Sequence, residues 1–445
     1  MWTGLGGPPD LLPRLEFAGS GALPSVFAVG DLAAAAVGVA GLAVSELRQC
    51  VDGRSDPVSV DGRLASLWYG WSLQPVGWDL PAPWDPLAGD YETADGWIRL
   101  HTNAPHHRAA ALATLRVAPE RDAVARAVAG WSSDALEREV VFAGGCAAAM
   151  NTPQAWRGHP QGAAVHAEPL VHVLRSADQD GSSWRPLPTQ PLQGLRVLDL
   201  TRVLAGPVAT RFLAGFGANV LRIDPPGWDE PAVIPDVTLG KRCARLDLRA
   251  ANDRAVFEGL LADADLIIHG YRADALEALG FGEVRRRHVR PGLVDVSLNA
   301  YGWSGPWRNQ RGFDSLVQMS AGIAAEGMRQ LQRGKPTPLP VQALDHATGY
   351  LMAAAAIRGL TERLGTSRGC TARLSLARTA ALLVDGPRGE TVVDAARAEA
   401  SDWSDTLELT GFGPARRLRG PVTVGETAMQ WDRPAARLGS SPAAW

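Results

Sequence analysis

The sequence predicts an α/β protein, in which a doubly wound parallel sheet is accompanied by a smaller α+β domain. Between residues 195 and 298, short apolar runs alternate with segments of helical periodicity, which is typical of parallel strands joined by helices on both faces of a sheet. Residues 176–193 are rich in polar residues, glycine and proline, and therefore indicate a linker. Before this linker, residues 88–102 have the pattern of a hairpin, which indicates a separate domain.

Each apolar run in the second half of the chain is expected to form one buried strand. Strands are predicted at residues 195–200, 219–224, 245–248, 266–269 and 293–298. The periodic segments between them predict helices at residues 209–216, 252–262 and 274–279. In the first half, the hairpin turns at Ala94-Asp95-Gly96, and helices are expected to follow at residues 108–115 and 121–130.

These elements divide the chain into five segments. We predict a helix–strand segment at 1–75, a small α+β domain at 76–175, the linker at 176–193, a Rossmann-like catalytic domain at 194–385, and a tail packed on that domain at 386–445. The first segment is interpreted as a degenerate repeat of the end of the catalytic domain, because a shift of 314 residues places Asp31 on Asp345 and Pro24 on Pro338. The alternative is two unrelated alanine-rich helices.

The composition is that of a globular protein, with 46% apolar and 20% charged residues. Because 44 basic residues are balanced by 47 acidic ones, nucleic acid is not an expected partner. The cysteines stand far apart and form no zinc or disulfide pattern, which favours a reducing cytoplasm. The first residues do not resemble a signal peptide, and the longest apolar stretch, 32–44, is too short to span a bilayer. We therefore expect a cytoplasmic protein with no metal site and no membrane contact.

The turn after the first strand of the catalytic domain is a candidate phosphate-binding site. It runs from Thr201 to Pro207 and lacks the GxGxxG pattern that lets the backbone approach a pyrophosphate closely. We therefore expect no nicotinamide cofactor, although Asp224 ends the second strand, where a ribose-binding acid would lie. The helix that begins near Pro207 and the adjacent Arg202 suit another phosphate ligand, because helix N-termini attract anions.

Several motifs between residues 192 and 314 follow one another in the order found in a known family. They are LQGLRVLDL at 192–200, AGP at 205–207, GANV at 217–220, GKR and LDL within 240–248, ADLI at 264–267, ALEALG at 275–280, YGWSGP at 301–306 and RGFD at 311–314. Together they resemble family III CoA-transferases, the CaiB/BaiF group that includes formyl-CoA and carnitine CoA-transferases. Asp345 lies where that family carries its catalytic aspartate. The resemblance implies an enzyme that moves CoA from an acyl-CoA donor to a carboxylic acid acceptor.

The same resemblance implies how coenzyme A is bound. The residues implied to bind it are Arg202, Val203, Leu204, Tyr271 and Arg272. The family often has an arginine after the second strand, where this chain has the run 224–227, so that phosphate contact is assigned to Lys241 or Arg242. No permanently bound cofactor is implied, and a homodimer is expected. The chain departs from the family because segments that resemble its small domain, at 89–103 and 155–162, come first, which indicates a rearranged variant.

Asp345 is also chemically suited to be a nucleophile. A carboxylate that attacks a thioester forms a mixed anhydride, and the returning CoA thiolate converts this into an aspartyl-CoA thioester. Free backbone N–H groups at a strand-to-helix junction would stabilise the oxyanion. The alternative is that Asp345 only caps a helix that begins at His346, as Asp31 is expected to cap its own helix.

Two other functions are compatible with these residues. An α-methylacyl-CoA racemase requires two opposed proton-transfer groups, and Phe313 stands where such racemases resemble this chain but have histidine. A non-catalytic CoA-binding homologue is the second alternative. Of the histidines, His106 and His107 are expected to begin a surface helix without a chemical role. His346 adjoins Asp345 but is expected to point in a different direction, and an indirect role behind Asp345 is the less favoured alternative.

Overall fold

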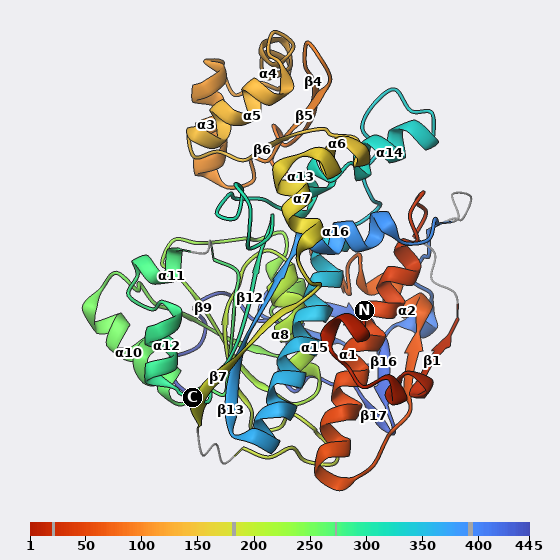
Figure 1. The fold of residues 1–445 in the computed structure, drawn as a ribbon, viewed down its shortest axis with the longest axis vertical. Helices are drawn as coiled ribbons and strands as arrows, with labels where there is room; N and C mark the ends of the chain where they lie inside the picture. Colours follow the sequence, from red (N-terminus) through yellow and green to blue (C-terminus); the bar gives the residue numbers. More distant parts are fainter. Residues whose placement is uncertain (20–22, 180–183, 272–273, 390–394) are drawn as a thin grey trace.

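The computed structural model describes residues 1–19, 23–179, 184–271, 274–389 and 395–445. Figure 1 shows a large lobe built around one sheet and a smaller lobe above it. The small lobe contains the residues between about the 85th and 150th positions, and the rest of the chain forms or covers the large lobe. The mixed α/β fold predicted from the sequence is confirmed.

The main sheet lies at the centre of the large lobe. Its described strands are β7 (His172–Gln179), β8 (Arg196–Leu200), β9 (Asn219–Asp224), β10 (Lys241–Arg245), β11 (Leu266–His269), β12 (Val294–Asn299) and β13 (Arg368–Ser375). They are hydrogen-bonded in the order β10-β9-β8-β11-β12-β13-β7, with β8 to β13 parallel and β7 antiparallel at one edge. The strand order reverses between β8 and β11, and a sheet of this kind opens a crevice at that point beyond its carboxyl ends.

Helices cover both faces of the sheet, because neighbouring residues on a strand point in opposite directions. Val197 and Leu198 of β8 accordingly belong to two different hydrophobic cores. One core contains α8 (Ala205–Gly215) and α15 (Ala343–Thr366), and the other contains α10 (Ala251–Ala262), α11 (Ala275–Ala278) and α12 (Glu283–Val289). The buried residues Val220 and Leu266 extend the first core across the strands, so α8 and α15 are held tightly against the sheet.

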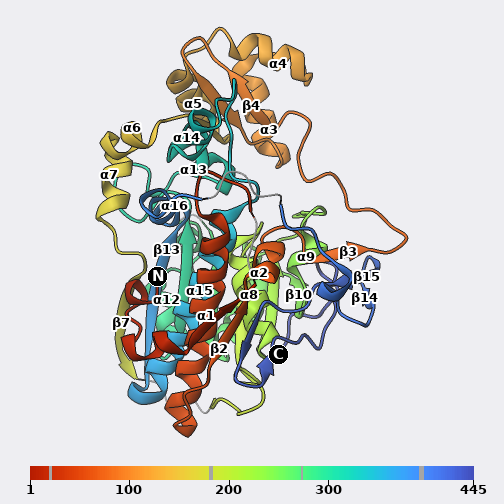
Figure 2. The same cartoon turned by 90° about the vertical axis from the view of Figure 1, so that its right-hand side faces the viewer.

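A further helix lies outside α15. This helix, α1 (Val29–Asp52), packs along α15 on one side and against a small sheet on the other (Figure 2). The small sheet consists of β1 (Leu15–Ala18), β2 (Val58–Asp61), β16 (Val422–Val424) and β17 (Thr427–Ala428). The expectation that the apolar stretch of α1 is too short to span a bilayer is wrong for the whole helix. By length and composition α1 is the one described helix that could cross a membrane, yet 78% of its most apolar window is buried inside the protein.

The small lobe has its own core. It consists of β4 (Gly89–Glu92), β5 (Trp97–Leu100), β6 (Ala147–Ala149), α3 (Pro105–Leu115), α4 (Arg121–Val128) and α5 (Ser133–Phe142). The hairpin formed by β4 and β5 turns where the sequence predicts it. The helices between the two lobes are α6 (Pro153–Gly158), α7 (Pro160–Ala167), α13 (Asp314–Ser320), α14 (Ile323–Gln330) and α16 (Leu376–Asp385).

The remaining elements lie around the large lobe. They are the 3-10 helices η1 (Thr3–Leu5), η2 (Pro9–Arg14) and η3 (Ala400–Asp402), the helices α2 (Gly62–Trp68) and α9 (Ile234–Val237), and the strands β3 (Leu73–Pro75), β14 (Glu408–Thr410) and β15 (Gly413–Arg417). The strands β14, β15 and β3 form a sheet of their own. The C-terminal segment therefore joins sheets with N-terminal strands in addition to covering the catalytic half.

Three local predictions are wrong. The third strand lies at Lys241–Arg245 instead of 245–248. This strand has no apolar run in the sequence because it begins with Lys241, a charged residue that can be buried only because it forms an ion pair with Asp199. The predicted linker begins with part of β7, whose residues 172–175 are exposed, so an edge strand forms here without an apolar run. Asp31 does not cap its helix as predicted, because α1 begins at Val29 with Ala28 as its N-cap. The equivalent start of α15, with Gln342 as its N-cap, also excludes the alternative in which Asp345 only caps α15.

Two helix–strand–helix units in the large lobe have matching bounds. A shift of 314 residues places α1 on α15 from the first to the last residue, and it places Asp61 at the end of β2 on Ser375 at the end of β13. Both of these strand-end side chains accept a hydrogen bond from a backbone N–H three residues later, and so cap α2 and α16 in the same way. We call residues 29–68 the first unit and residues 343–382 the second unit.

Candidate functional site

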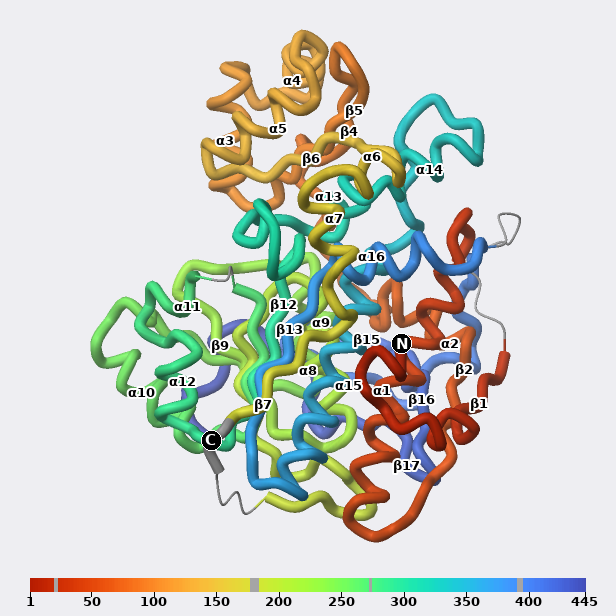
Figure 3. Tube along the Cα trace, in the orientation of Figure 1, coloured from red at the N-terminus to blue at the C-terminus, as the bar shows by residue number. Residues whose placement is uncertain are grey.

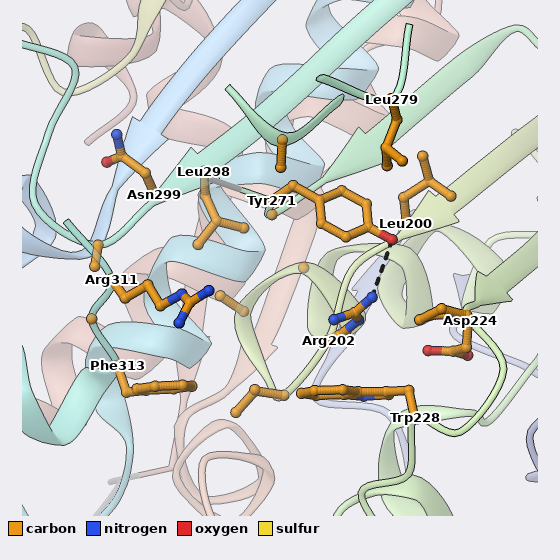
Figure 4. Close-up of a pocket in the computed structure, with 18 of the residues that line it drawn as sticks. Leu200, Arg202, Asp224, Trp228, Tyr271, Leu279, Leu298, Asn299, Arg311 and Phe313 are labelled. Atoms are coloured by element: carbon orange, nitrogen blue, oxygen red, sulfur yellow. Dashed lines mark hydrogen bonds between the residues drawn. The ribbon is translucent and has the colours of Figure 1, made fainter. Parts of the chain in front are cut away.

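A cavity of about 910 Å³ opens at the carboxyl ends of the parallel strands (Figure 4). Leu200, Asp224, Tyr271 and Leu298 line it from the ends of β8, β9, β11 and β12. Residues of the small lobe and of the segment before α13 close it from the other side, among them His107 and Phe313. The cavity thus occupies the crevice at the switch point of the sheet, where open α/β proteins bind their ligands.

Asp345 lies in the wall of this cavity, in the first turn of α15. Its side chain is almost fully buried, and its carboxyl group accepts a hydrogen bond from the backbone N–H of Ala205, the first residue of α8. Gly349, one turn after Asp345, permits this approach, because a Cβ atom there would lie 2.4 Å from the Ala205 carbonyl oxygen. Two helix N-termini therefore converge on the same carboxyl group, which favours negative charge on it.

A second buried carboxyl group lies beside the first. Asp314 Oδ2 accepts the backbone N–H of Asp345 at 2.9 Å, and the Gln318 side chain donates to Asp314 Oδ1. Burial raises the pKa of Asp314 to about 6. Burial, and then the charge of Asp314, raise the pKa of Asp345 well above its usual range. Because Asp314 has the larger number of N–H donors, we assign the shared negative charge to Asp314 and the proton to Asp345 in the empty site.

Arg202 also lines the cavity, where it lies between two aromatic rings. Its guanidinium carbon is 4.2 Å from the centre of the Trp228 ring and 5.1 Å from that of Tyr271, and it donates a hydrogen bond to the Tyr271 hydroxyl at 3.3 Å (Figure 4). Stacking of this kind fixes a planar cation and presents flat apolar faces to a ligand. The arrangement is suited to the base and phosphates of a nucleotide.

The turn that carries Arg202 is strained. Val203 has a φ of 62°, a left-handed conformation that is costly for a β-branched residue. Its backbone N–H donates to Glu230 Oε1 at 2.9 Å, and Glu230 in turn pairs with buried Arg222. Strain held in this way at a cavity wall is typical of a functional turn.

The structure brings part of the predicted site together. Asp345, Arg202, Val203 and Tyr271 line the cavity, whereas Leu204 is the N-cap of α8 and is not among the lining residues. Arg272 lies outside the described residues.

The two basic residues proposed for the remaining phosphate contact do not reach the cavity. Lys241 is buried between β10 and α8, where its Nζ atom lies 2.9 Å from Asp199 Oδ2. Arg242 donates to the Ala444 carbonyl oxygen and to Asn219 Oδ1. Both side chains are therefore occupied by intramolecular partners.

The histidine predictions are partly wrong. His107 is buried with only 4% of its surface exposed and lines the cavity, although His106 beside it is exposed as expected. Phe313 lies between His107 and His101, with its ring centre 3.8 Å from that of His101. His346 does not line the cavity and stacks on Tyr69, the residue directly after the first unit, at 4.9 Å between ring centres. Trp228 and Arg311 also line the cavity without having been predicted as site residues. No local pattern includes Trp228, whereas Arg311 belongs to the RGFD motif, which was used only to recognise the family.

No group of three or more histidine, cysteine, aspartate or glutamate side chains suited to a metal ion occurs in the described part of the chain.

Residues 192–406 match the profile described as CoA-transferase family III. This segment, which contains the parallel sheet and Asp345, therefore belongs to that family, also called CaiB/BaiF. The whole cavity except its small-lobe wall is built from it.

Individual relatives match the same part of the chain. The acetyl-coenzyme A transferase nodX of Hypoxylon pulicicidum is 34% identical over 44% of this chain and 35% of its own length. The probable fatty acyl-CoA transferase Rv3272 of Mycobacterium tuberculosis is 32% identical over 40% of this chain and 48% of its own length. The crystal structure of Rv3272 shares 31% identity and a TM-score of 0.41 over 44% of this chain and 56% of that one. The chain thus spans about a third to about a half of the length of the curated relatives that it matches.

Proposed function

We propose that this protein is a CoA-transferase that moves CoA from an acyl-CoA donor to a carboxylic acid through a covalent intermediate on Asp345. The observation that carries the proposal is the position of Asp345 in the wall of the strand-end cavity, at the N-terminus of α8. Its carboxyl group lies in the segment that matches the family, and a nucleotide site lies across the same cavity.

The proposed reaction has four balanced steps. The Asp345 carboxylate attacks the thioester carbonyl, the C–S bond breaks, and a mixed anhydride and CoA thiolate form. The thiolate then attacks the aspartyl carbonyl, which releases the donor acid and leaves an aspartyl-CoA thioester. The acceptor carboxylate attacks this thioester and expels the thiolate again. Finally the thiolate attacks the acceptor carbonyl of the second anhydride, which gives the new acyl-CoA and frees Asp345.

No net proton is consumed in these steps, but the first requires ionised Asp345. Burial and the neighbouring Asp314 favour its protonated form in the empty site. The rate should therefore rise with pH beyond the range in which an ordinary aspartate ionises. Once Asp345 is ionised, the Ala205 N–H and the N-terminal end of α8 stabilise the carboxylate that is regenerated in the last step.

The nucleotide end of CoA is proposed to bind at Arg202. The flat faces of Trp228 and Tyr271 would hold the adenine, while the guanidinium group bonds a phosphate. Val203 holds the turn that aims Arg202, and Leu204 caps the helix behind it. Pantetheine would then extend along the cavity toward Asp345, which lines the same cavity as Arg202.

The test is covalent trapping. Wild-type protein incubated with a panel of acyl-CoAs is expected to gain the mass of an adduct that hydroxylamine removes. Asp345→Asn should form no adduct, whereas Asp31→Asn should form it normally, because Asp31 is exposed and does not line the cavity. An adduct on Asp345→Asn with undiminished yield would refute the proposal.

A second candidate activity is racemisation at the α-carbon of an acyl-CoA. It is favoured by one observation: His101 and His107 contact Phe313, the position where histidine occurs in the resembling racemases. A histidine from another segment of the chain would then oppose the carboxyl pair. Exchange of the α-hydrogen in deuterated water without CoA transfer would favour this activity over the first.

Cellular location and assembly form part of the same proposal. We expect the protein to act in the cytoplasm, on soluble acyl-CoA and carboxylic acid, and to associate as a homodimer. Light scattering of the purified full chain measures the association directly, and a mass equal to one chain would contradict it.

A further inference from the structure

Glu230 connects the strained turn at Val203 to a buried ion pair. Its Oε1 atom accepts the Val203 backbone N–H at 2.9 Å, and its Oε2 atom accepts a hydrogen bond from Arg222 at 3.2 Å. Arg222 also donates to both carboxyl oxygens of Asp224, at 2.8 and 2.9 Å, and the side chains of this pair are fully buried. Both oxygens of Glu230 therefore have a fixed partner, and the carboxyl group is held between the turn and the main sheet.

The Val203 turn needs an external partner of this kind. With a φ of 62°, Val203 is left-handed, and its Cβ atom crowds the following carbonyl oxygen. A β-branched residue released from this conformation would return to a negative φ, and Arg202 beside it would then point in another direction. The hydrogen bond from Val203 to Glu230 opposes that change.

The segment that contains Glu230 also supplies Trp228. The Trp228 ring lies 4.2 Å from the guanidinium carbon of Arg202, as Figure 4 shows, while Glu230 bonds the backbone of Val203. Arg245 fastens the same segment to β10, because its side chain donates to the Trp228 carbonyl oxygen at 3.0 Å. The segment thus contacts two successive residues of the turn, the first through an aromatic ring and the second through a carboxylate.

We propose that Glu230 is a positioning residue for coenzyme A: it keeps Val203 left-handed and so directs Arg202 toward the nucleotide. This rests on the proposed function. A backbone N–H has one proton to donate, and that of Val203 is already bonded to Glu230. The N–H is therefore closed to a phosphate, and the Arg202 side chain is the group of this turn that recognises one.

The test combines Glu230→Ala with Val203→Gly. Glu230→Ala releases the turn, so the Kd for CoA and the KM for acyl-CoA should each rise about 10-fold while kcat stays within about twofold. Adding Val203→Gly should recover most of this loss, because glycine adopts a positive φ without strain. A merely structural role would instead lower the yield of active protein, and glycine would not repair it.

Asp229→Asn is the matched control. Asp229 is an exposed acid that accepts the backbone N–H of Glu230 at 2.9 Å. Asparagine keeps this acceptor and removes a negative charge beside Glu230, so CoA binding should stay at the wild-type level. A general effect of local charge would appear in this variant as well.

Calorimetry with CoA alone separates this proposal from the proposed function. If the wild type binds CoA, Glu230→Ala weakens the binding and Val203→Gly restores it, the role of Glu230 is supported even if no acid is a substrate for transfer. Unchanged binding in Glu230→Ala, or weakened binding that Val203→Gly does not restore, would overturn this role and leave that of Asp345 untouched.

An independent observation concerns the strands on either side of the two units. In the first unit, β2 lies between β1, which is parallel to it, and β16, which is antiparallel. In the second unit, β13 lies between β12, which is parallel to it, and β7, which is antiparallel. Figure 3 shows β7 beside β13 and β16 beside β2, although each pair is far apart in sequence. The two units therefore have the same neighbours in the same orientations.

The registers of the two antiparallel pairs also correspond. Arg373 of β13 lies opposite His172, and Ser59 of β2 lies opposite Thr423. Ser59 and Arg373 are the equivalent positions under the shift of 314 residues. In the sequence, however, β7 follows the first unit and β16 follows the second. Each unit is thus completed by the strand that follows the other unit.

We infer that the chain contains two copies of one folding unit that have exchanged the antiparallel strands that follow them. The small lobe lies between the first unit and β7, so the pairing of β7 with β13 brings this lobe to the second copy. The cavity accordingly combines Asp345 of the second copy with residues of the lobe that follows the first copy. Both parts of this cavity come from one chain.

Paired cysteines test the exchange in the full chain. Ser59→Cys with Thr423→Cys, and His172→Cys with Arg373→Cys, place cysteines on directly opposed residues of antiparallel strands, within the Cα spacing of a disulfide. Each pair is made in a Cys50→Ser background, because Cys50 is the exposed natural cysteine in the described structure. Oxidation should join each pair within one chain, as measured on a non-reducing gel and by peptide mass.

The opposite combinations are the control. Ser59→Cys with His172→Cys, and Thr423→Cys with Arg373→Cys, would be opposed only if each unit kept the strand that follows it. We expect no cross-link within one chain for these combinations. Such a cross-link, dimers joined through the first two pairs, or failure of either of those pairs to cross-link would overturn the inference.

Discussion

The first and second units have helices with equivalent bounds, but the aspartates of these helices differ in burial and in contacts. Asp31 and Asp345 both occupy the third position of a 24-residue helix. Asp345 is buried against the N-terminus of α8, whereas Asp31 is exposed. The residue one turn later is Gly349 in the second unit and Ala35 in the first. The catalytic environment of Asp345 therefore depends on α8, which packs against its helix. A position in the first turn of a helix does not create that environment by itself.

The largest expected effect is on kcat, and it distinguishes Asp345 from Asp31. Asp345→Asn keeps the size of the side chain but removes the nucleophilic oxygen anion, so kcat should fall by about 10³-fold or more. Asp31→Asn should stay within about twofold of wild type, since its carboxylate contacts no cavity residue. Steady-state CoA transfer measures both. A dead Asp31 variant beside a live Asp345 variant would show that the wrong unit was assigned.

The close approach that distinguishes the units is tested by exchanging their residues. Gly349→Ala places a Cβ atom 2.4 Å from the Ala205 carbonyl oxygen and 2.8 Å from Val208 Cβ, so α15 must move away from α8. We expect about 1–3 kcal/mol of destabilisation and about a 10²-fold loss of kcat, since a carboxyl group displaced by about 1 Å reacts poorly. Ala35→Gly is the matched change in the first unit. It should cost about 1 kcal/mol through helix propensity and leave kcat unchanged.

The first unit has no nucleotide-binding half before it, whereas the second unit does. The role of this half in binding acyl-CoA is tested by changing Arg202. Arg202→Ala removes the cation held between Trp228 and Tyr271 and should raise KM for acyl-CoA about 10-fold with a smaller effect on kcat. Inhibition by free CoA should weaken by the same factor. A change in kcat alone would show that Arg202 acts on the reacting end instead of the nucleotide.

The smallest expected effect is a pH-dependent change in stability. Because burial and Asp314 raise the pKa of Asp345, folding favours its protonated form, and this stabilisation is lost as pH rises from about 4 through the folded pKa. Removing the charge should therefore make Asp345→Asn gain about 1 kcal/mol relative to wild type between pH 5 and pH 8. Urea unfolding at both pH values measures it. Asp31→Asn is the control, and its difference from wild type should be the same at both.

Much of the catalytic half could be predicted from sequence because its strands are buried on both faces. β9 and β11 have the predicted bounds, since an apolar run between helical segments needs no distant partner to be recognised. The site was predicted in part for the same reason: Arg202 and Val203 lie at a strand-to-helix junction of this half. Asp345 instead lies in the first turn of α15, and all three residues line the cavity.

What the sequence determined by itself is the set of elements in which apolar periodicity is local, together with the aspartate in the first turn of an alanine-rich helix. Only the tertiary structure decided the rest. Lys241, which looks like a free phosphate-binding cation, is neutralised by Asp199 from another strand, and His107, which looks like the start of a surface helix, is buried beside Phe313. The polar residues at the start of the linker became β7 because β13 offered them backbone partners. In each case the deciding contact comes from a residue far away in the chain, and the local pattern contains no record of it.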